Sequence, residues 1–210
     1  MSYGKITSAA LDPVEKKPFV KFHPGSLILS VGTFGCNMDC PFCQNYEIAG
    51  AGEGDVPTRG VSPTELAALA DELRGRGNIG VAYTYNEPLV GWEFVRDSAA
   101  EVKKRGLKNA AVTNGSVSAE TLSELLPYID AYNIDLKGFT DEYYRKLGGD
   151  LEAVKEFIKT AASEAHVELT TLIVPGENDG DDEMAALSAW IASVDRKIPL
   201  HLTRFFPRRL

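Results

Sequence analysis

The three cysteines of this chain all lie in one short segment, CNMDCPFC, as Cys36, Cys40 and Cys43. Thiolates are ligands of iron–sulfur clusters, and a [4Fe–4S] cube normally takes four of them. Three thiolates from one loop would leave one iron without a protein ligand, where a small molecule can bind. The spacing therefore predicts a cluster with an open coordination site.

Other cysteine sites fit this pattern less well. A structural zinc site needs four ligands, so His23, His166 or His201 would have to complete it, and His23 is nearest in sequence. A thiol–disulfide pair of Cys40 and Cys43 would leave Cys36 without a role. An odd number of cysteines argues against a disulfide framework. Zinc bound with His23 remains the alternative.

The C-x3-C-x2-C spacing resembles that of the radical S-adenosylmethionine (SAM) enzymes. In that family the open iron is chelated by the amino and carboxylate groups of SAM. An electron from the cluster then cleaves SAM to methionine and a 5′-deoxyadenosyl radical. The resemblance implies two cofactors, a [4Fe–4S] cluster on these cysteines and SAM.

Composition and charge narrow the class of protein. At 210 residues, with 44% hydrophobic and 25% charged residues, the chain has the size and composition of one globular domain. It has no apolar run of the ~20 residues that span a bilayer and no apolar signal region. Unpaired thiols favour a reducing cytoplasm. The net charge of −8 argues against a nucleic-acid partner.

Short β-branched segments alternate with segments of helical period, which is typical of βα units with a parallel sheet. We predict six strands, at Leu27–Thr33, Gly80–Tyr85, Ala110–Thr113, Ala131–Asp135, Val167–Val174 and Leu200–Phe205. We predict five helices, at 62–73, 92–105, Ser118–Leu126, Leu151–Glu164 and Asp181–Val194.

A closed eight-stranded barrel usually needs about 250 residues, so six strands favour a partly open (β/α)6 barrel. The resemblance to radical SAM enzymes implies the same α/β fold. We expect a single domain over residues 1–210, with a leader segment at 1–26 that packs on the core. We also expect a monomer.

Reactive groups in such folds gather at the carboxyl ends of the strands. The second strand is followed by Asn86 and Glu87, which offer a carbonyl and a carboxylate to a bound ammonium. In radical SAM enzymes this position carries the motif, often Gly-Gly-Glu, that holds the SAM amino group. The resemblance assigns that role to Glu87; a surface turn is the alternative.

Further candidates follow the later strands. Thr113 and Asn114 can bond hydroxyls or a carboxylate. Asp135 and Lys137 share one strand face, so they form either part of the SAM site or a structural ion pair. Phe42, between two cysteines, is expected beside the adenine or else in the core. The sequence assigns no residue to catalysis; the candidates, both on the sixth strand, are His201 and Arg204.

Three motifs resemble the glycyl-radical-enzyme activases, such as pyruvate formate-lyase activating enzyme: Thr113-Asn114-Gly115, Asp135-Leu136-Lys137 and Val174-Pro175-Gly176. Val112 and Thr170 depart from that pattern, which has an acid and a basic residue there. The resemblance implies hydrogen abstraction from a glycine of a partner enzyme. A flavodoxin- or ferredoxin-type protein would supply the electron.

A closer resemblance is to the AmmeMemoRadiSam branch of the superfamily, which is usually described as activase-like. It rests on segments 3–8, 12–18, 23–26, 32–37 and 83–88. Members of that branch commonly extend beyond both ends of this chain. Two other functions stay open: a radical SAM enzyme that modifies a small molecule or peptide, and a non-catalytic zinc or iron–sulfur binding module.

Overall fold

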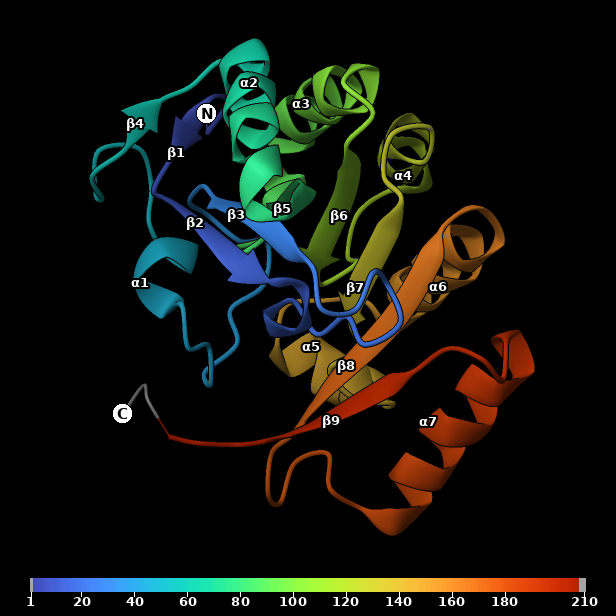
Figure 1. The fold of residues 1–210 in the computed structure, drawn as a ribbon. Helices are drawn as coiled ribbons and strands as arrows, with labels where there is room; N and C mark the ends of the chain where they lie inside the picture. The colour runs from blue at the N-terminus through green and yellow to red at the C-terminus, as the bar shows by residue number, and fades with distance from the viewer. Residues whose placement is uncertain (1, 208–210) are drawn as a thin grey trace.

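The computed structural model describes residues 2–207 and contains one large sheet (Figure 1). Its strand order is β2-β3-β5-β6-β7-β8-β9. The six strands from β3 to β9 are parallel, and β2 runs antiparallel to β3 at one edge. The strands are β2 Ser8–Pro13, β3 Leu27–Gly32, β5 Asn78–Tyr83, β6 Lys108–Thr113, β7 Ala131–Asp135, β8 His166–Ile173 and β9 Leu200–Arg204. A separate two-stranded sheet pairs β1 Lys5–Ile6 with β4 Arg59–Gly60.

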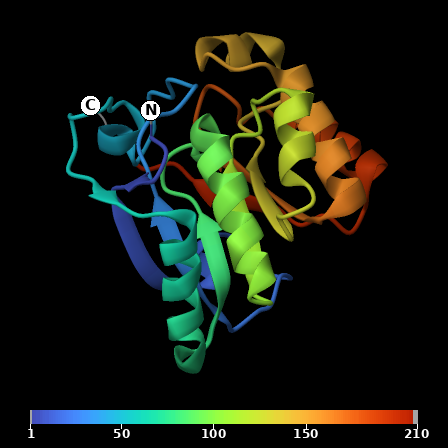
Figure 2. The same ribbon diagram turned by 90° about the horizontal axis from the view of Figure 1, so that it is seen from above.

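The helices are α1 Tyr46–Ala49, α2 Pro63–Glu72, α3 Trp92–Lys104, α4 Ala119–Leu125, α5 Asp141–Lys146, α6 Leu151–Glu164 and α7 Asp181–Val194. Of these, α2, α3, α4, α6 and α7 lie in chain order along one side of the sheet (Figures 1 and 2). Short 3₁₀ segments are η1 Val14–Lys16, η2 Leu73–Arg76 and η3 Pro88–Gly91. Because β2 and β9 are the two edges of the sheet, the barrel stays open. The predicted partly open (β/α)6 barrel is confirmed.

Local sequence signals explain where several helices begin. Ser62 and Glu65 form a capping box, and Pro63 takes the first position of α2. Ser118 and Asp150 cap α4 and α6 by accepting hydrogen bonds from backbone amides. The elements α1, α5, β1, β2 and β4 were not predicted, because helices of four and six residues carry little periodic signal, β1 and β4 have two residues each, and β2 buries only one side chain.

The sheet has a core on each face. On the inner face, Ala82, Ala110 and Ala131 lie in register on neighbouring strands. Their small side chains leave room for Phe19 and Phe22 of the leader, which are both buried in the same cluster. Because large apolar groups must fill the space that small ones leave, the leader occupies the inside of the barrel.

Candidate functional site

The carboxyl ends of the strands surround a cavity of about 640 Å³, a volume typical of small-molecule sites. Of the residues predicted for the site, this cavity is lined by Cys36, Cys40, Phe42, Cys43, Asn86, Glu87, Thr113, Asn114, Asp135, Lys137 and Arg204. Residues from segments far apart in the chain therefore converge at one end of the barrel. His201 is not among the lining residues.

The loop that carries Cys36, Cys40 and Cys43, called the cysteine loop below, follows β3. Its three thiols are free, and each is partly buried. The Cys43 amide donates to the Cys40 carbonyl at 3.1 Å, and the Asp39 amide donates to the Leu147 carbonyl at 3.0 Å. The Met38 amide lies 3.4 Å from Cys36 Sγ. Burial raises the pKa of the Cys40 thiol to about 11. The loop thus presents three sulfurs and a backbone donor to the cavity.

The donor set fits a cluster better than a single metal ion. Within residues 2–207, no group of three or more Cys, His, Asp or Glu side chains converges closely enough to hold one ion. A four-iron cube separates its ligands more widely than a tetrahedral zinc does. His23, the expected fourth zinc ligand, packs against Phe22 on the leader, with ring centroids 4.7 Å apart, and does not line the cavity that the three cysteines line. The zinc alternative therefore loses the ligand on which it depended.

The Asn86 side chain forms hydrogen bonds with Thr33 and Gly35, the residues that lead into the cysteine loop. Its Nδ2 donates to Thr33 Oγ1 at 2.9 Å and to the Gly35 carbonyl at 3.0 Å, and its Oδ1 accepts from the Thr33 amide at 3.0 Å. We expected the Asn86 carbonyl to face a bound ammonium; in the structure it faces Thr33. Asn86 lines the cavity and also fixes the loop that carries the cysteines.

Glu87 is buried, with 3% exposure, and still reaches the cavity. Its carboxylate accepts hydrogen bonds from Leu89 N at 3.0 Å, Thr113 Oγ1 at 2.7 Å and Asn114 N at 2.7 Å. Burial raises the pKa of Glu87 to about 7 in spite of these donors. A nearby cation would favour the ionised form, so the carboxylate is suited to an ammonium ligand.

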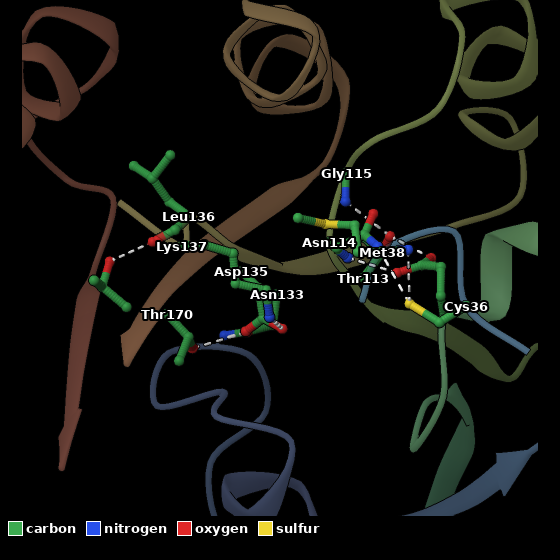
Figure 3. A network of polar contacts seen from close by, with 12 residues as sticks. Cys36, Met38, Thr113, Asn114, Gly115, Asn133, Asp135, Leu136, Lys137 and Thr170 are labelled. Atoms are coloured by element: carbon green, nitrogen blue, oxygen red, sulfur yellow. Dashed lines mark hydrogen bonds and ion pairs between the residues drawn. The ribbon is translucent and has the colours of Figure 1, made fainter. Parts of the chain in front are cut away.

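Thr113 and Asn114 link the cysteine loop to the end of β6 (Figure 3). Asn114 Nδ2 donates to Asn37 Oδ1 at 2.8 Å and lies 3.8 Å from Cys36 Sγ. Asn37 Nδ2 donates in turn to the Ser116 carbonyl at 2.6 Å. Nothing in the sequence singled out Asn37, which lies between the predicted ligands Cys36 and Cys40. Its side chain attaches the cysteine loop to the segment that follows β6.

Asp135 and Lys137, both labelled in Figure 3, form an ion pair of 2.6 Å at the end of β7, and both residues line the cavity. Burial disfavours the Lys137 ammonium, but Asp135 more than offsets this and keeps the pKa of Lys137 above its usual value. Backbone contacts fix the same segment: Lys137 N donates to Tyr144 Oη at 3.0 Å, and Asn178 Nδ2 donates to the Lys137 carbonyl at 2.6 Å. The pair is rigidly placed and partly open to a ligand.

His201 lies in a different cluster. Its Nε2 is 2.7 Å from a carboxylate oxygen of Glu168, and His166 Nε2 is 2.9 Å from the other. The same carboxylate accepts hydrogen bonds from the amides of Val20 and Lys21 in the leader. His201 therefore helps to hold the leader inside the barrel, whereas Arg204, the other catalytic candidate, does line the cavity.

The leader supplies cavity residues that the sequence analysis did not assign. Lys16 and Lys17 line the cavity together with Tyr85. Tyr85 adopts a positive φ of 76°, which is rare for a residue with a bulky side chain. Lys16 and Lys17, which follow Glu15 and precede Pro18, entered the sequence interpretation only as part of segment 12–18.

Comparisons with known proteins agree with this geometry. A family model described as the radical SAM superfamily matches residues 30–188. An uncharacterized protein of Methanocaldococcus jannaschii is 37% identical over 209 residues, covering 99% of this chain and 61% of that protein. The pyruvate formate-lyase 1-activating enzyme of Escherichia coli is 31% identical over 152 residues, covering 70% of this chain and 61% of that enzyme. The chain thus spans about three fifths of each of these relatives.

Solved structures share the fold. Streptococcus suis SuiB bound to S-adenosylmethionine superposes with a TM-score of 0.65 at 13% identity, over 82% of this chain and 39% of that one. QueE from Escherichia coli gives a TM-score of 0.51 at 13% identity, over 95% and 93% of the two chains. With the three cysteines at the strand ends and the family match over residues 30–188, the chain belongs to the radical SAM superfamily, whose members use a [4Fe–4S] cluster and SAM.

Proposed function

We propose that this protein is an activase-like enzyme that reductively cleaves SAM and abstracts a hydrogen atom from a glycine of a partner protein. The observation that carries the proposal is the single cavity that brings the three cysteines together with Glu87 and the Asp135–Lys137 pair. The 31% identity to a pyruvate formate-lyase activating enzyme supports the choice of substrate class.

In this proposal each part of the cavity has a separate task. Cys36, Cys40 and Cys43 hold the cluster, and Glu87 accepts hydrogen bonds from the SAM ammonium. The other SAM contacts come from the remaining cofactor residues predicted above, Phe42, Asn86, Thr113, Asn114, Asp135 and Lys137, with Phe42 beside the adenine. When bound, the cluster and SAM supply a 5′-deoxyadenosyl radical; the chain binds, orients and excludes water.

The partners follow from the chemistry. Reductive cleavage consumes one electron, for which we propose a flavodoxin- or ferredoxin-type donor in the cytoplasm. Among residues 2–207 no helix has the length and apolar character needed to cross a membrane. We propose a protein substrate because two residues that line the cavity, Lys16 and Arg204, are also exposed at the surface of the described residues.

The test uses anaerobically reconstituted, reduced enzyme with SAM and a candidate glycyl radical enzyme whose glycines carry deuterium at the α-carbon. We expect deuterium in 5′-deoxyadenosine and a glycyl radical signal in electron paramagnetic resonance spectra. SAM cleavage without deuterium transfer from the glycines would contradict the activase proposal and favour a small molecule or modified peptide as substrate. An absence of SAM cleavage would remove the enzymatic proposal itself.

A further inference from the structure

Charged residues are segregated within the cavity. Glu87 and the Asp135–Lys137 pair lie at the ends of β5 and β7, beside the cysteine loop. Basic residues line the cavity from two other segments, Lys16 and Lys17 from the leader and Arg204 from the end of β9. The residues assigned above to the cluster and SAM leave these three without a role.

The two lysines share one carboxylate. Lys16 Nζ lies 3.1 Å from Asp12 Oδ1, and Lys17 Nζ lies 3.0 Å from Asp12 Oδ2. Burial would raise the pKa of Asp12, but hydrogen bonds from Lys17, Lys16 and Tyr85 lower it to about 2. Asp12 is therefore ionised near neutral pH. Burial lowers the pKa of Lys17, and the Asp12 carboxylate opposes that shift. Two lysines and one carboxylate give the cluster an excess of one basic residue.

Lys17 is held in place rather than free in solvent. Its side chain is only 6% exposed, and its ammonium lies 4.3 Å from the centroid of the Tyr85 ring. Tyr85 Oη donates to Asp12 at 2.9 Å, and the Tyr85 carbonyl accepts from Asn45 Nδ2 at 2.7 Å. These contacts keep Tyr85 at its positive φ, and residues held in such a backbone conformation cluster at functional sites. The positive charge is thus fixed before a ligand arrives.

Arg204 adds a second positive group. Its guanidinium lies 5.5 Å from the centroid of the Phe206 ring, and no carboxylate among residues 2–207 pairs with it. An arginine with free N–H groups at a cavity wall can bind a carboxylate or phosphate through two parallel hydrogen bonds.

We propose that Lys16, Lys17 and Arg204 form a subsite for an anionic oxygen group of the substrate, a carboxylate or a phosphate. The inference rests on the proposed function for the location of the radical chemistry. With Cys36, Cys40 and Cys43 assigned to the cluster and Glu87 to the SAM ammonium, the basic residues Lys16, Lys17 and Arg204 are left to bind the anionic group, so that the C–H bond to be broken is directed toward the cysteine loop. The subsite would then set the substrate's orientation as well as its affinity.

The test is isothermal titration of the reconstituted enzyme with SAM bound and the cluster oxidised, so that no turnover occurs. The probes are inorganic phosphate, succinate and the neutral analogue succinamide, at constant ionic strength. We expect saturable binding of phosphate or succinate and none of succinamide. Lys16→Met and Arg204→Met should each weaken anion binding by about tenfold, as loss of a charged hydrogen bond does. The two anion probes decide between a phosphate and a carboxylate.

Two further variants sharpen the test. Asp12→Asn combined with Lys17→Met removes the buried pair and leaves only the exposed Lys16 without its carboxylate partner; it removes one of the three proposed anion ligands and should weaken anion binding by about tenfold. Lys159→Met is the matched control, since it removes one lysine of an exposed ion pair on α6. Equal binding of succinamide, equal weakening by Lys159→Met, or no saturation by either anion would overturn the inference. If SAM cleavage by the same samples is intact, such a result leaves the proposed function standing.

Discussion

Glu87 and Thr113 lie at the ends of neighbouring parallel strands and are joined by a hydrogen bond of 2.7 Å from the Thr113 hydroxyl to the Glu87 carboxylate. Asn114 N adds a second bond of 2.7 Å to the other oxygen. The carboxylate is therefore fixed before any ligand binds, so that little conformational entropy is lost when an ammonium group docks on it.

Glu87→Gln should weaken SAM binding while leaving the iron content of the reconstituted protein nearly unchanged. A hydrogen bond to a charged group contributes about 1.5–3 kcal/mol, so the affinity should fall by about ten- to a hundredfold. Equilibrium binding of SAM and iron analysis on the same samples check this. Glu72→Gln, at an exposed position on α2, is the control. An unchanged SAM affinity in Glu87→Gln would return Glu87 to a structural role.

Alanine in place of Cys36, Cys40 or Cys43 should abolish SAM cleavage in each case, because the cube loses one of its three protein ligands. Iron and sulfide content should fall together with cleavage. Met38→Leu is a matched control, since Met38 is a buried residue of the same loop and Leu conserves its volume. Retained cleavage in one cysteine variant would remove that residue from the ligand set.

Asp135→Ala and Lys137→Ala should each reduce SAM binding or cleavage, and the double variant should be much less than additive because the two side chains form one ion pair. The fold should survive, since residues at the carboxyl ends of such strands serve chemistry more than stability. Melting and cleavage are measured on the same samples. Lower melting temperatures with full cleavage by the folded fraction would identify a structural pair instead.

Glu168→Gln should destabilise the protein near neutral pH. Burial would raise the pKa of Glu168, but the amides of Val20 and Lys21 and the two imidazoles keep it below its usual value. A lowered carboxyl pKa contributes stability above the unfolded-state value, and that stability is lost as the pH falls through the folded-state value. We therefore expect a loss of about 2 kcal/mol at pH 7, or about 4–8 °C in Tm for a domain of this size.

The difference in Tm between wild type and Glu168→Gln should shrink as the pH falls below about 4. Limited proteolysis should cut the leader near Lys21 faster in the variant, because two leader amides lose a charged acceptor. Glu164→Gln, at an exposed position, serves as control. A Tm difference that stays constant from pH 7 to pH 3 would show that ionisation of Glu168 does not hold the leader.

Local patterns along the chain were enough to predict the cysteine loop and the order of the main elements. Cys36, Cys40 and Cys43 are neighbours along the chain, so covalent connection brings them together whatever the fold. The six parallel strands and five of the helices follow from apolar periodicity and capping residues such as Ser62, which act within a few positions of one another. Their order then placed Glu87 and Asp135 at the same edge of a parallel sheet.

Contacts between side chains that are far apart in the sequence depend instead on how the folded chain packs. Glu168 accepts hydrogen bonds from leader amides that are 148 and 147 residues away in the sequence. It also contacts His201, a catalytic candidate that does not line the cavity. Lys17 enters the cavity because Phe19 and Phe22 fill the space beside three small alanines. Such pairings depend on how volumes and charges fit once the sheet has closed around the leader, and no local pattern in the sequence encodes that fit.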